Sequence, residues 1–258
     1  MTTTAARATE LLALHTSPKI LTLVNVWDVA SAKAVAAVEG TTALATASHG
    51  IAATYGYPDG EQIPVDLMLE MVGRIAAAVD LPVSADLEAG YGDPGETIRR
   101  AVGLGIVGAN LEDQLKPLPD AVRAVAAAVA AAERAGIPFV LNARTDAFLR
   151  AGDRDPAEVL ADAIERGRAY LDAGASTFFA PGLLDEATVT ALVDALGPQK
   201  VNLIGIPGAL PLEAMQRLGV ARVSYGPWSQ NVALTALADL AAAVRAGGGI
   251  PENTRKLN

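Results

Sequence analysis

The sequence predicts an α/β fold, a single (β/α)8 barrel of the TIM type. Short apolar runs alternate with longer segments in which apolar residues recur every three or four positions, as in buried strands that alternate with amphipathic helices. Eight such units follow one another without a long structureless gap, which favours a closed parallel barrel over an open sheet. Apolar residues make up 51% of the chain and aromatic residues only 4%, so we expect a core of Ala, Val, Leu and Ile.

The predicted strands and helices alternate along the whole chain. The strands are expected at residues 20–26, 43–47, 83–88, 106–112, 139–144, 177–180, 201–205 and 222–225. The helices are expected at residues 29–38, 65–79, 94–104, 121–135, 156–173, 186–196, 212–218 and 229–245. Glycine recurs in the helix-to-strand turns, where it provides the left-handed residue that ends a helix. We expect one domain over residues 1–258, with a helical extension at 1–19 and a flexible tail at 247–258.

Composition limits the possible partners. The net charge of −9 argues against a nucleic-acid or anionic-membrane partner, which would call for a basic patch. The absence of cysteine excludes disulfides, thiolate metal ligands and cysteine nucleophiles. No signal peptide or run of about 18 apolar residues is present, so a cytoplasmic protein is expected. No glycine-rich phosphate-binding motif opens a helix, which disfavours nucleotide binding.

Two carboxylates follow each other closely at the end of the third predicted strand. Side chains alternate along a strand, so Ser84, Asp86 and Glu88 are expected on one face, toward the barrel mouth. Acids at this spacing repel unless a cation or a shared proton compensates them, and Mg²⁺ prefers such oxygen ligands. The alternative is that they cap the following helix, although Asp93 is better placed for that. We therefore favour a site for a divalent cation.

Polar residues also end the fourth and fifth predicted strands. By alternation Asn110 and Glu112 face inward beside the third strand, although Glu112 could instead begin a solvated loop. Asn142 and Arg144 are expected on the inward face of the fifth strand. Arg144 has two open interpretations: it is an ion-pair partner for these acids, or it clamps a substrate carboxylate through two parallel hydrogen bonds.

The second predicted strand leads into a loop of small residues at 46–50. Free backbone N–H groups in such a loop can bind an anion. His49 lies in this loop and is one of only two histidines in the chain. It is a candidate catalytic residue, and an ordinary surface histidine is the alternative.

Taken together, these segments resemble the isocitrate lyase/phosphoenolpyruvate mutase superfamily, over about residues 20–226. The segments that carry the resemblance are Asn25-Val26-Trp27-Asp28, residues 46–50, Gly56-Tyr57-Pro58-Asp59, Ala85-Asp86-Leu87-Glu88-Ala89-Gly90-Tyr91-Gly92, Asn110-Leu111-Glu112-Asp113-Gln114 and Asn142-Ala143-Arg144-Thr145-Asp146. The acidic segments of the third and fourth strands are specific as a pair, whereas either alone would be a weak signal.

The resemblance implies a set of site residues. The metal would be Mg²⁺, with Mn²⁺ as the second candidate, and Asp86 would be its most direct ligand. Asp59, Glu88 and Glu112 would hold it through bound waters. The substrate would be a small carboxylic or 2-oxo acid, and its carboxylate would be held by Arg144 and the backbone of Ala47, Ser48 and Gly50. Asn202, at the start of the seventh strand, falls near a polar position that members of the superfamily direct toward the substrate.

One departure from the superfamily bears on the reaction. Isocitrate and methylisocitrate lyases carry a Lys-Arg-Cys-Gly-His type of loop after the fourth strand, and its cysteine is the acid/base. Here residues 112–120 run straight into a helix, and Lys116 only partly matches the lysine of the phosphonate-processing members. The chain therefore resembles the short, cysteine-less, phosphonomutase-like branch.

The favoured function is a Mg²⁺-dependent lyase that cleaves a carbon–carbon bond of a small 2-oxo or 2-hydroxy carboxylic acid through a metal-stabilised enolate. Two alternatives stay open: a phosphonopyruvate-type mutase or hydrolase of P–C bonds, and a non-catalytic protein that binds 2-oxo acids. Asp59, His49 and Arg144 are the predicted catalytic residues. Further candidates for proton transfer are Tyr55, Tyr91 and Lys116.

The last predicted helix, at 229–245, has almost no polar face. Asp239 and Arg245 are its only charged residues, and alanines lie on nearly every side. An ordinary eighth barrel helix would also have an apolar stripe. Members of the resembled superfamily exchange their last helix between subunits, so we expect a homodimer or homotetramer with this helix in the contact.

Overall fold

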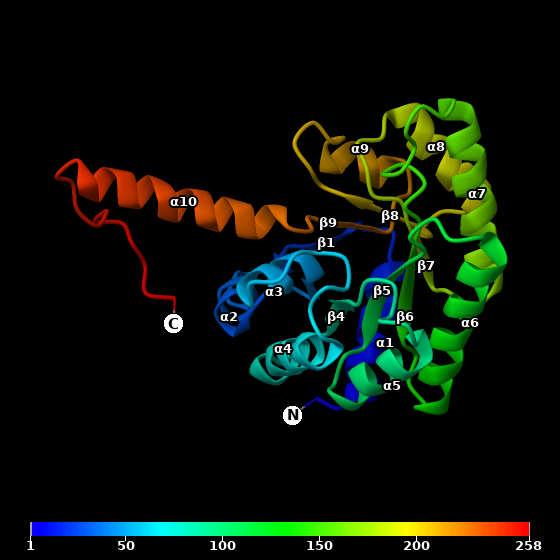
Figure 1. Ribbon diagram of the computed structural model, residues 1–258, viewed down its shortest axis with the longest axis horizontal. Helices are drawn as coiled ribbons and strands as arrows, with labels where there is room; N and C mark the ends of the chain where they lie inside the picture. Colours follow the sequence, from blue (N-terminus) through cyan, green and yellow to red (C-terminus); the bar gives the residue numbers. More distant parts are fainter. Residues whose placement is uncertain (1, 258) are drawn as a thin grey trace.

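Nine parallel strands form a nearly closed, TIM-like barrel in the computed structural model, which describes residues 2–257 (Figure 1). The predicted fold class is confirmed. The first predicted strand is split at Val24 into two short strands, which accounts for the ninth. The strands are β1 (Leu21–Leu23), β2 (Asn25–Val26), β3 (Leu44–Thr46), β4 (Val83–Asp86), β5 (Gly108–Glu112), β6 (Val140–Arg144), β7 (Thr177–Phe179), β8 (Val201–Ile204) and β9 (Arg222–Ser224).

The helices follow the predicted order, with one addition. They are α1 (Thr4–Thr16), α2 (Val29–Ala36), α3 (Ser48–Thr54), α4 (Val65–Ala78), α5 (Pro94–Gly103), α6 (Leu118–Arg134), α7 (Pro156–Asp172), α8 (Glu186–Leu196), α9 (Leu212–Arg217) and α10 (Trp228–Arg245). The addition is α3, where a loop was expected. Within residues 2–257, no helix combines the length and apolar character needed to span a membrane.

Helix α1 closes the end of the barrel at which the strands begin. Its buried Ala8 and Leu11 pack in one cluster with residues of four strands or strand starts: Leu21, Leu23, Ala43, Ala45, Val107 and Val140. Gly108 permits this approach, because a Cβ atom there would lie 2.8 Å from Leu11 Cδ2. The opposite end of the barrel stays open.

The side chain of Asn25, in β2, links the end of β3 to the residues that follow β9. Its Nδ2 donates to the carbonyl of Thr46 at 2.8 Å. Its Oδ1 accepts hydrogen bonds from the backbone N–H of Tyr225 at 2.7 Å and of Gly226 at 2.8 Å. β1 pairs with β9 and β2 pairs with β3, so this one side chain spans the interruption between the two ends of the strand order.

Helix α10 projects away from the barrel instead of covering it (Figure 1). Only Gln230 of its residues is buried, whereas Val232 is 69% exposed and Leu237 is 60% exposed. The alternative of an ordinary eighth barrel helix is therefore wrong. Residues 246–257, which follow α10, form neither helix nor strand.

Candidate active site

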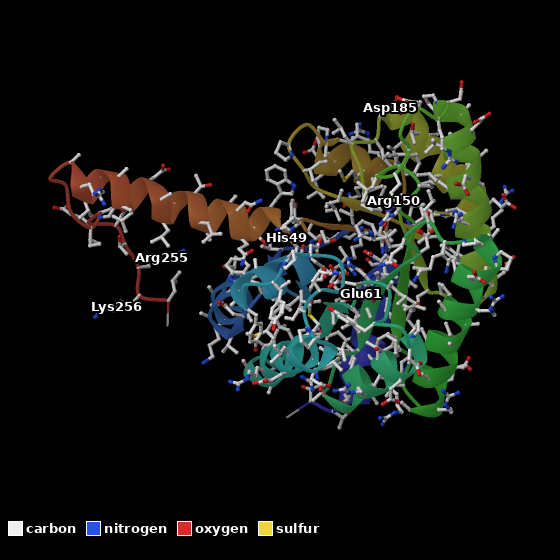
Figure 2. All side chains as sticks on the ribbon, viewed as in Figure 1. His49, Glu61, Arg150, Asp185, Arg255 and Lys256 are labelled. Carbon is white, nitrogen blue, oxygen red and sulfur yellow. The ribbon has the colours of Figure 1, made fainter. Side chains whose placement is uncertain are left out.

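A cavity of about 290 Å³ opens at the carboxyl ends of the strands. Each strand from β2 to β9 contributes lining residues, either from its own end or from the loop that follows it. Figure 2 shows His49 near the point where α10 leaves the barrel. Six of the residues predicted from the sequence line this cavity: Ala47, Ser48, His49, Asp59, Asp86 and Arg144.

Asp86 is held at the end of β4 by the neighbouring strand β3. Its backbone N–H donates to Thr46 Oγ1 at 3.0 Å. Its Oδ2 accepts two hydrogen bonds from Ser48, from the backbone N–H at 3.1 Å and from the hydroxyl at 2.8 Å. Both bonds go to one carboxylate oxygen, and the side chain lines the cavity. Asp86 is thus an oriented anionic group at the barrel mouth.

Glu88 does not follow the strand alternation on which its prediction rested. The chain leaves the extended conformation after Asp86, and Glu88 has a φ of +50°. Its carboxylate accepts hydrogen bonds from the Tyr91 hydroxyl at 2.8 Å and from the backbone N–H of Glu61. Burial raises the pKa of Glu88 to about 7, and the charges of Asp86 and Asp59 act in the same direction. Glu88 does not line the cavity among the described residues.

Glycine is needed in this loop at position 90. Its φ is +88°, which L side chains rarely adopt, and a Cβ atom there would lie 2.6 Å from Pro94 Cα. Gly90 N–H donates to the Leu87 carbonyl at 3.0 Å, which closes the turn that follows Asp86. Asp93 then caps α5 through a bond from Glu96 N–H, as the sequence indicated.

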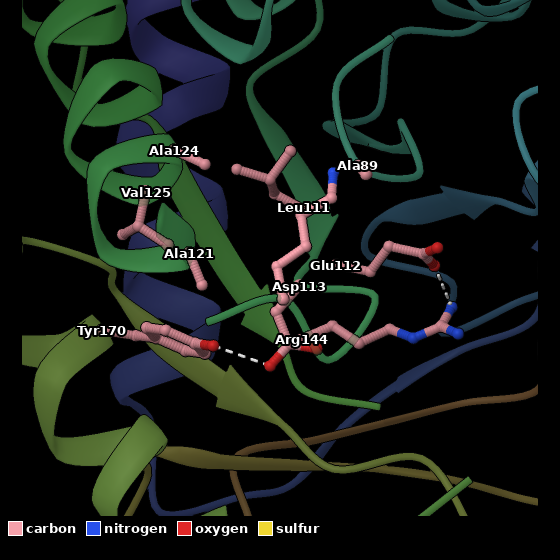
Figure 3. Close-up of a pocket in the computed structure, with 10 residues that line it drawn as sticks. Ala89, Leu111, Glu112, Asp113, Ala121, Ala124, Val125, Arg144 and Tyr170 are labelled. Atoms are coloured by element: carbon pink, nitrogen blue, oxygen red, sulfur yellow. Dashed lines mark hydrogen bonds and ion pairs between the residues drawn. The ribbon is translucent and has the colours of Figure 1, made fainter. Parts of the chain in front are cut away.

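Arg144 is an ion-pair partner of neighbouring acids, which was one of its two interpretations, and its role as a clamp for a substrate carboxylate stays a prediction. It forms an ion pair with Glu112 at 2.9 Å (Figure 3) and another with Asp146 at 2.8 Å. It also lines the main cavity. Burial opposes its charge, but the carboxylates of Glu112, Asp146 and Asp86 raise its pKa overall. Burial also raises the pKa of Glu112 to about 8, because the Arg144 charge only partly offsets the desolvation.

A second ionic network lies directly behind this pair and has no counterpart in the sequence analysis. Asp113 is buried and accepts hydrogen bonds from Arg166 Nη1 at 3.1 Å and from the Tyr170 hydroxyl at 2.7 Å (Figure 3). It also accepts bonds from the Thr145 hydroxyl and from the backbone N–H of Asp146. The cavity beside it measures only about 20 Å³, which suits a water molecule and not a substrate.

Two predicted substrate-binding residues lie away from the main cavity. Asn202 is fully buried and donates to Asn142 Oδ1 at 2.6 Å and to Thr177 Oγ1 at 3.0 Å. Gly50 is buried within α3, and its carbonyl accepts a bond from Gln230. Neither residue lines the cavity in the described part of the chain.

The expected loop at 46–50 is mostly a helix. Ala47 is extended and precedes the first turn of α3, whose Gly-Ile-Ala-Ala run is too short for a helical periodicity to be recognised. The backbone N–H of Ala47 donates to Val26, and that of Ser48 donates to Asp86. Their use for a substrate carboxylate stays a prediction, and it would require these bonds to be exchanged.

Of the four candidates for proton transfer, His49 is the one that lines the cavity among the described residues. Its Nδ1 lies 3.6 Å from Asp59 Oδ2, and both side chains are about half exposed. The Tyr91 hydroxyl is already committed to Glu88. The geometry therefore favours His49, with Asp59 as its partner.

The donor set suits a hard divalent cation held by few direct ligands. Nowhere in residues 2–257 do three acidic or histidine side chains stand close enough to bind an ion together. Mg²⁺, however, keeps several waters and needs only one or two carboxylates. Asp86 is the acid best oriented for direct contact, while Glu88 and Glu112 lie in its electrostatic reach. All of these groups offer oxygen.

These features define a TIM-like barrel protein whose candidate site is acidic and opens at the carboxyl ends of the strands. The chain belongs to the phosphoenolpyruvate mutase/isocitrate lyase superfamily, because the family model described as phosphoenolpyruvate phosphomutase matches residues 11–245. The superfamily includes carbon–carbon lyases, hydrolases and mutases.

Similar proteins cover nearly the whole chain. A solved structure from Burkholderia cenocepacia J2315, whose assignment as a phosphonomutase is itself provisional, has 41% identity and a TM-score of 0.85, and covers 92% of this chain and 99% of that one. An uncharacterised protein of Mycobacterium tuberculosis is 35% identical over 93% of this chain and 90% of its own length. The oxaloacetate decarboxylase of Paraburkholderia xenovorans is 30% identical over 88% of this chain and 78% of its own.

Proposed function

We propose that this protein is a Mg²⁺-dependent lyase that cleaves a carbon–carbon bond of a small 2-oxo or 2-hydroxy carboxylic acid. One observation carries the proposal: the oriented carboxylate of Asp86 and the guanidinium of Arg144 line the same cavity at the barrel mouth. An anionic oxygen ligand and a carboxylate-binding cation in one small site are what a metal-assisted reaction of a 2-oxo acid requires.

Each residue of the site would have its own role in the proposed reaction. Asp86 would hold the cation directly, with Glu88 and Glu112 behind it. When bound, Mg²⁺ would stabilise the negative charge that develops on the 2-oxo oxygen. Arg144 would hold the substrate carboxylate, and its bonds to Glu112 and Asp146 fix the orientation of the guanidinium. His49 would take or return a proton, with Asp59 Oδ2 lying 3.6 Å from its Nδ1.

Two other functions remain in view. A P–C mutase or hydrolase of the phosphonopyruvate type is supported by similarity to the phosphonopyruvate hydrolase of Variovorax, which is 26% identical over 78% of this chain. A binding protein without turnover is favoured by the absence of a cysteine that could act as acid/base. The intact acidic set at the mouth argues against this second alternative.

A metal-dependent assay separates the three functions. The purified protein, stripped with EDTA and reloaded with Mg²⁺ or Mn²⁺, is offered oxaloacetate, 2-alkylmalates, methylisocitrate and phosphonopyruvate. We expect a 2-oxo acid product from a carbon substrate, lost on EDTA treatment and restored by Mg²⁺. Phosphate release from phosphonopyruvate would favour P–C chemistry. Binding of oxalate without turnover of any compound would favour the binding protein.

We also propose that the protein is a homodimer or homotetramer with α10 in the contact. Its exposed apolar side chains, among them Leu234 and Leu237, would otherwise face water over the length of the helix. Light scattering at micromolar concentration should give a multiple of 26.4 kDa. Leu237→Asp should lower that mass, whereas Leu183→Asp, an equally exposed residue on the barrel, should not. A mass near 26 kDa for the unmodified protein would exclude the assembly.

A further inference from the structure

The cavity at the barrel mouth has a polar side and an apolar side. Residues at the ends of β2 to β6 make the polar side, and the order of the strands keeps them together. The ends of β7, β8 and β9, with the loop after β6, make the apolar side, where Ser224 is the one polar side chain among the described lining residues. This apolar side comprises Leu149, Phe179, Pro181, Ile204, Ile206 and Trp228.

The charged groups of the cavity all belong to the polar side. Among the described residues that line it, they are His49, Asp59, Asp86 and Arg144. Arg144 is the one permanent cation of this set, and two carboxylates already share its charge. A substrate anion placed against the apolar side would lose its hydration without gaining a cation. A ligand carboxylate can therefore be paired at the polar side, but not at the apolar side.

We propose that the site selects 2-oxo acids with one carboxylate and an apolar tail over 2-oxo acids that carry a second, terminal carboxylate. The inference rests on the proposed function, because it takes the carboxylate and 2-oxo group to lie between Arg144 and Asp86. The tail then contacts Leu149, Ile206 and Trp228 across the cavity. A volume of about 290 Å³ is at the lower end for ligand pockets, so the tail is short.

A matched pair of ligands tests the charge of the far end. 2-Oxopentanoate and 2-oxoglutarate have the same chain length, and differ in a terminal methyl group or carboxylate. Titration calorimetry in Mg²⁺ should show 2-oxopentanoate binding at least roughly tenfold more tightly, because only the carboxylate must be buried unpaired. Along the series pyruvate, 2-oxobutanoate and 2-oxopentanoate, affinity should rise roughly two- to fourfold per methylene. Equal or tighter binding of 2-oxoglutarate would overturn the inference, and so would a flat series.

A substitution on the apolar side should reverse the preference. Leu149 is 54% exposed, so Leu149→Arg places a cation at the cavity without disturbing the core. We expect this variant to bind 2-oxoglutarate about tenfold more tightly and 2-oxopentanoate less tightly than the unmodified protein. Leu183→Arg is the control, because Leu183 is 63% exposed and does not line the cavity within the described chain. An unchanged preference in Leu149→Arg would contradict the assignment of the apolar side.

The binding experiment is independent of turnover, so the two proposals can fail separately. Preferred binding of 2-oxopentanoate without cleavage of any 2-oxo acid would defeat the lyase proposal and leave this inference standing. Cleavage of a dicarboxylic acid that binds more tightly than its methyl-ended counterpart would do the reverse. Failure of all these 2-oxo acids to bind would defeat both.

Discussion

Two acids that are neighbours in the sequence, Glu112 and Asp113, have very different surroundings at the end of β5. Glu112 lines the small cavity of about 20 Å³, has Arg144 as its ion-pair partner, and has a pKa raised to about 8 by burial. Asp113 points the other way, into the protein. There it accepts bonds from Leu115 N–H, Thr145, Asp146 N–H, Arg166 and Tyr170.

The difference indicates that Asp113 stabilises the fold, whereas the acids of the barrel mouth are available for a ligand. The acceptor capacity of Asp113 is used by five donors of the protein itself, so its charge is stabilised without any ligand. The acids of the mouth are partly buried near one another, which costs stability and is typical of functional sites. Asp113 should thus control folding, and Asp86 should control binding.

The largest expected effect is on stability. Asp113→Ala leaves the buried Arg166 and Tyr170 without their shared acceptor, and should lower the free energy of unfolding by about 3–5 kcal/mol. Urea denaturation measures this loss. Glu112→Gln, one residue away, should cost no more than about 1 kcal/mol, because Arg144 keeps its bond to Asp146. Equal losses in both variants would remove the distinction between the two acids.

The second prediction concerns binding at the mouth. Asp86→Ala should weaken Mg²⁺-dependent binding of oxalate by at least about 100-fold, because it removes the proposed direct metal ligand. The unfolding midpoint should change little. Asp93→Ala is the control, since it removes the cap of α5 and should cost about 1 kcal/mol of stability while oxalate affinity stays the same. Calorimetry that shows unchanged oxalate affinity in Asp86→Ala would defeat the metal assignment.

The third prediction concerns the buried His15 and the dependence of stability on pH. Burial, followed by the charge of Arg222, lowers the pKa of His15 to about 3, so the folded protein keeps it neutral. Its Nδ1 lies 2.8 Å from the Leu11 carbonyl. Well above pH 6.5, His15 is neutral in both the folded and the unfolded state, so its protonation does not reduce the free energy of unfolding. Below that value the unfolded chain binds a proton that the folded chain does not, so stability falls as the pH falls.

The expected size of the pH effect is about 2 kcal/mol between pH 7 and pH 5. It is measured as the difference between the urea denaturation curves of the unmodified protein and of His15→Gln, because other groups titrate in both. Parallel pH profiles for the two proteins would show that His15 is not held neutral.

The smallest predicted effect distinguishes the two roles of Arg144. Arg144→Lys keeps a positive charge but cannot make a two-pronged contact, so affinity for oxalate should fall about tenfold. A purely structural ion pair would instead survive the change, with oxalate affinity near that of the unmodified protein. Arg150→Lys is a suitable control, because Arg150 also contacts Asp146 but is more than half exposed.

The sequence predicted the barrel because its signals were local. Alternating apolar strands and periodic alanine-rich helices need no knowledge of distant contacts. Two predictions were wrong. The segment of α3 was expected as a loop, because it is too short to show a helical periodicity, and the first strand was expected to be continuous, although it is interrupted at Val24. An apolar stripe alone fits a helix that covers its own barrel or one that contacts a partner, so the expectation that α10 leaves its barrel rested on its lack of a polar face and on the resemblance.

The site was predictable to the extent that it depends on strand ends. Asp86 and Arg144 follow from alternation and from the barrel topology. Glu88 does not, because its loop is held by Glu61, which lies 27 positions earlier. Arg166 gave no signal at all, since it lies 53 positions after Asp113, on a helix whose pattern predicts an exposed charge.

The hydrogen bonds of the Asn25 side chain have a consequence for synthesis of the protein. Its partners Tyr225 and Gly226 lie 200 and 201 positions later, so the sheet cannot close until nearly the whole chain has left the ribosome. Until then β1 and β8 are open strand edges, which favour pairing with other chains. Translation slowed late in the message should therefore lengthen exposure of these edges and increase the demand for chaperones.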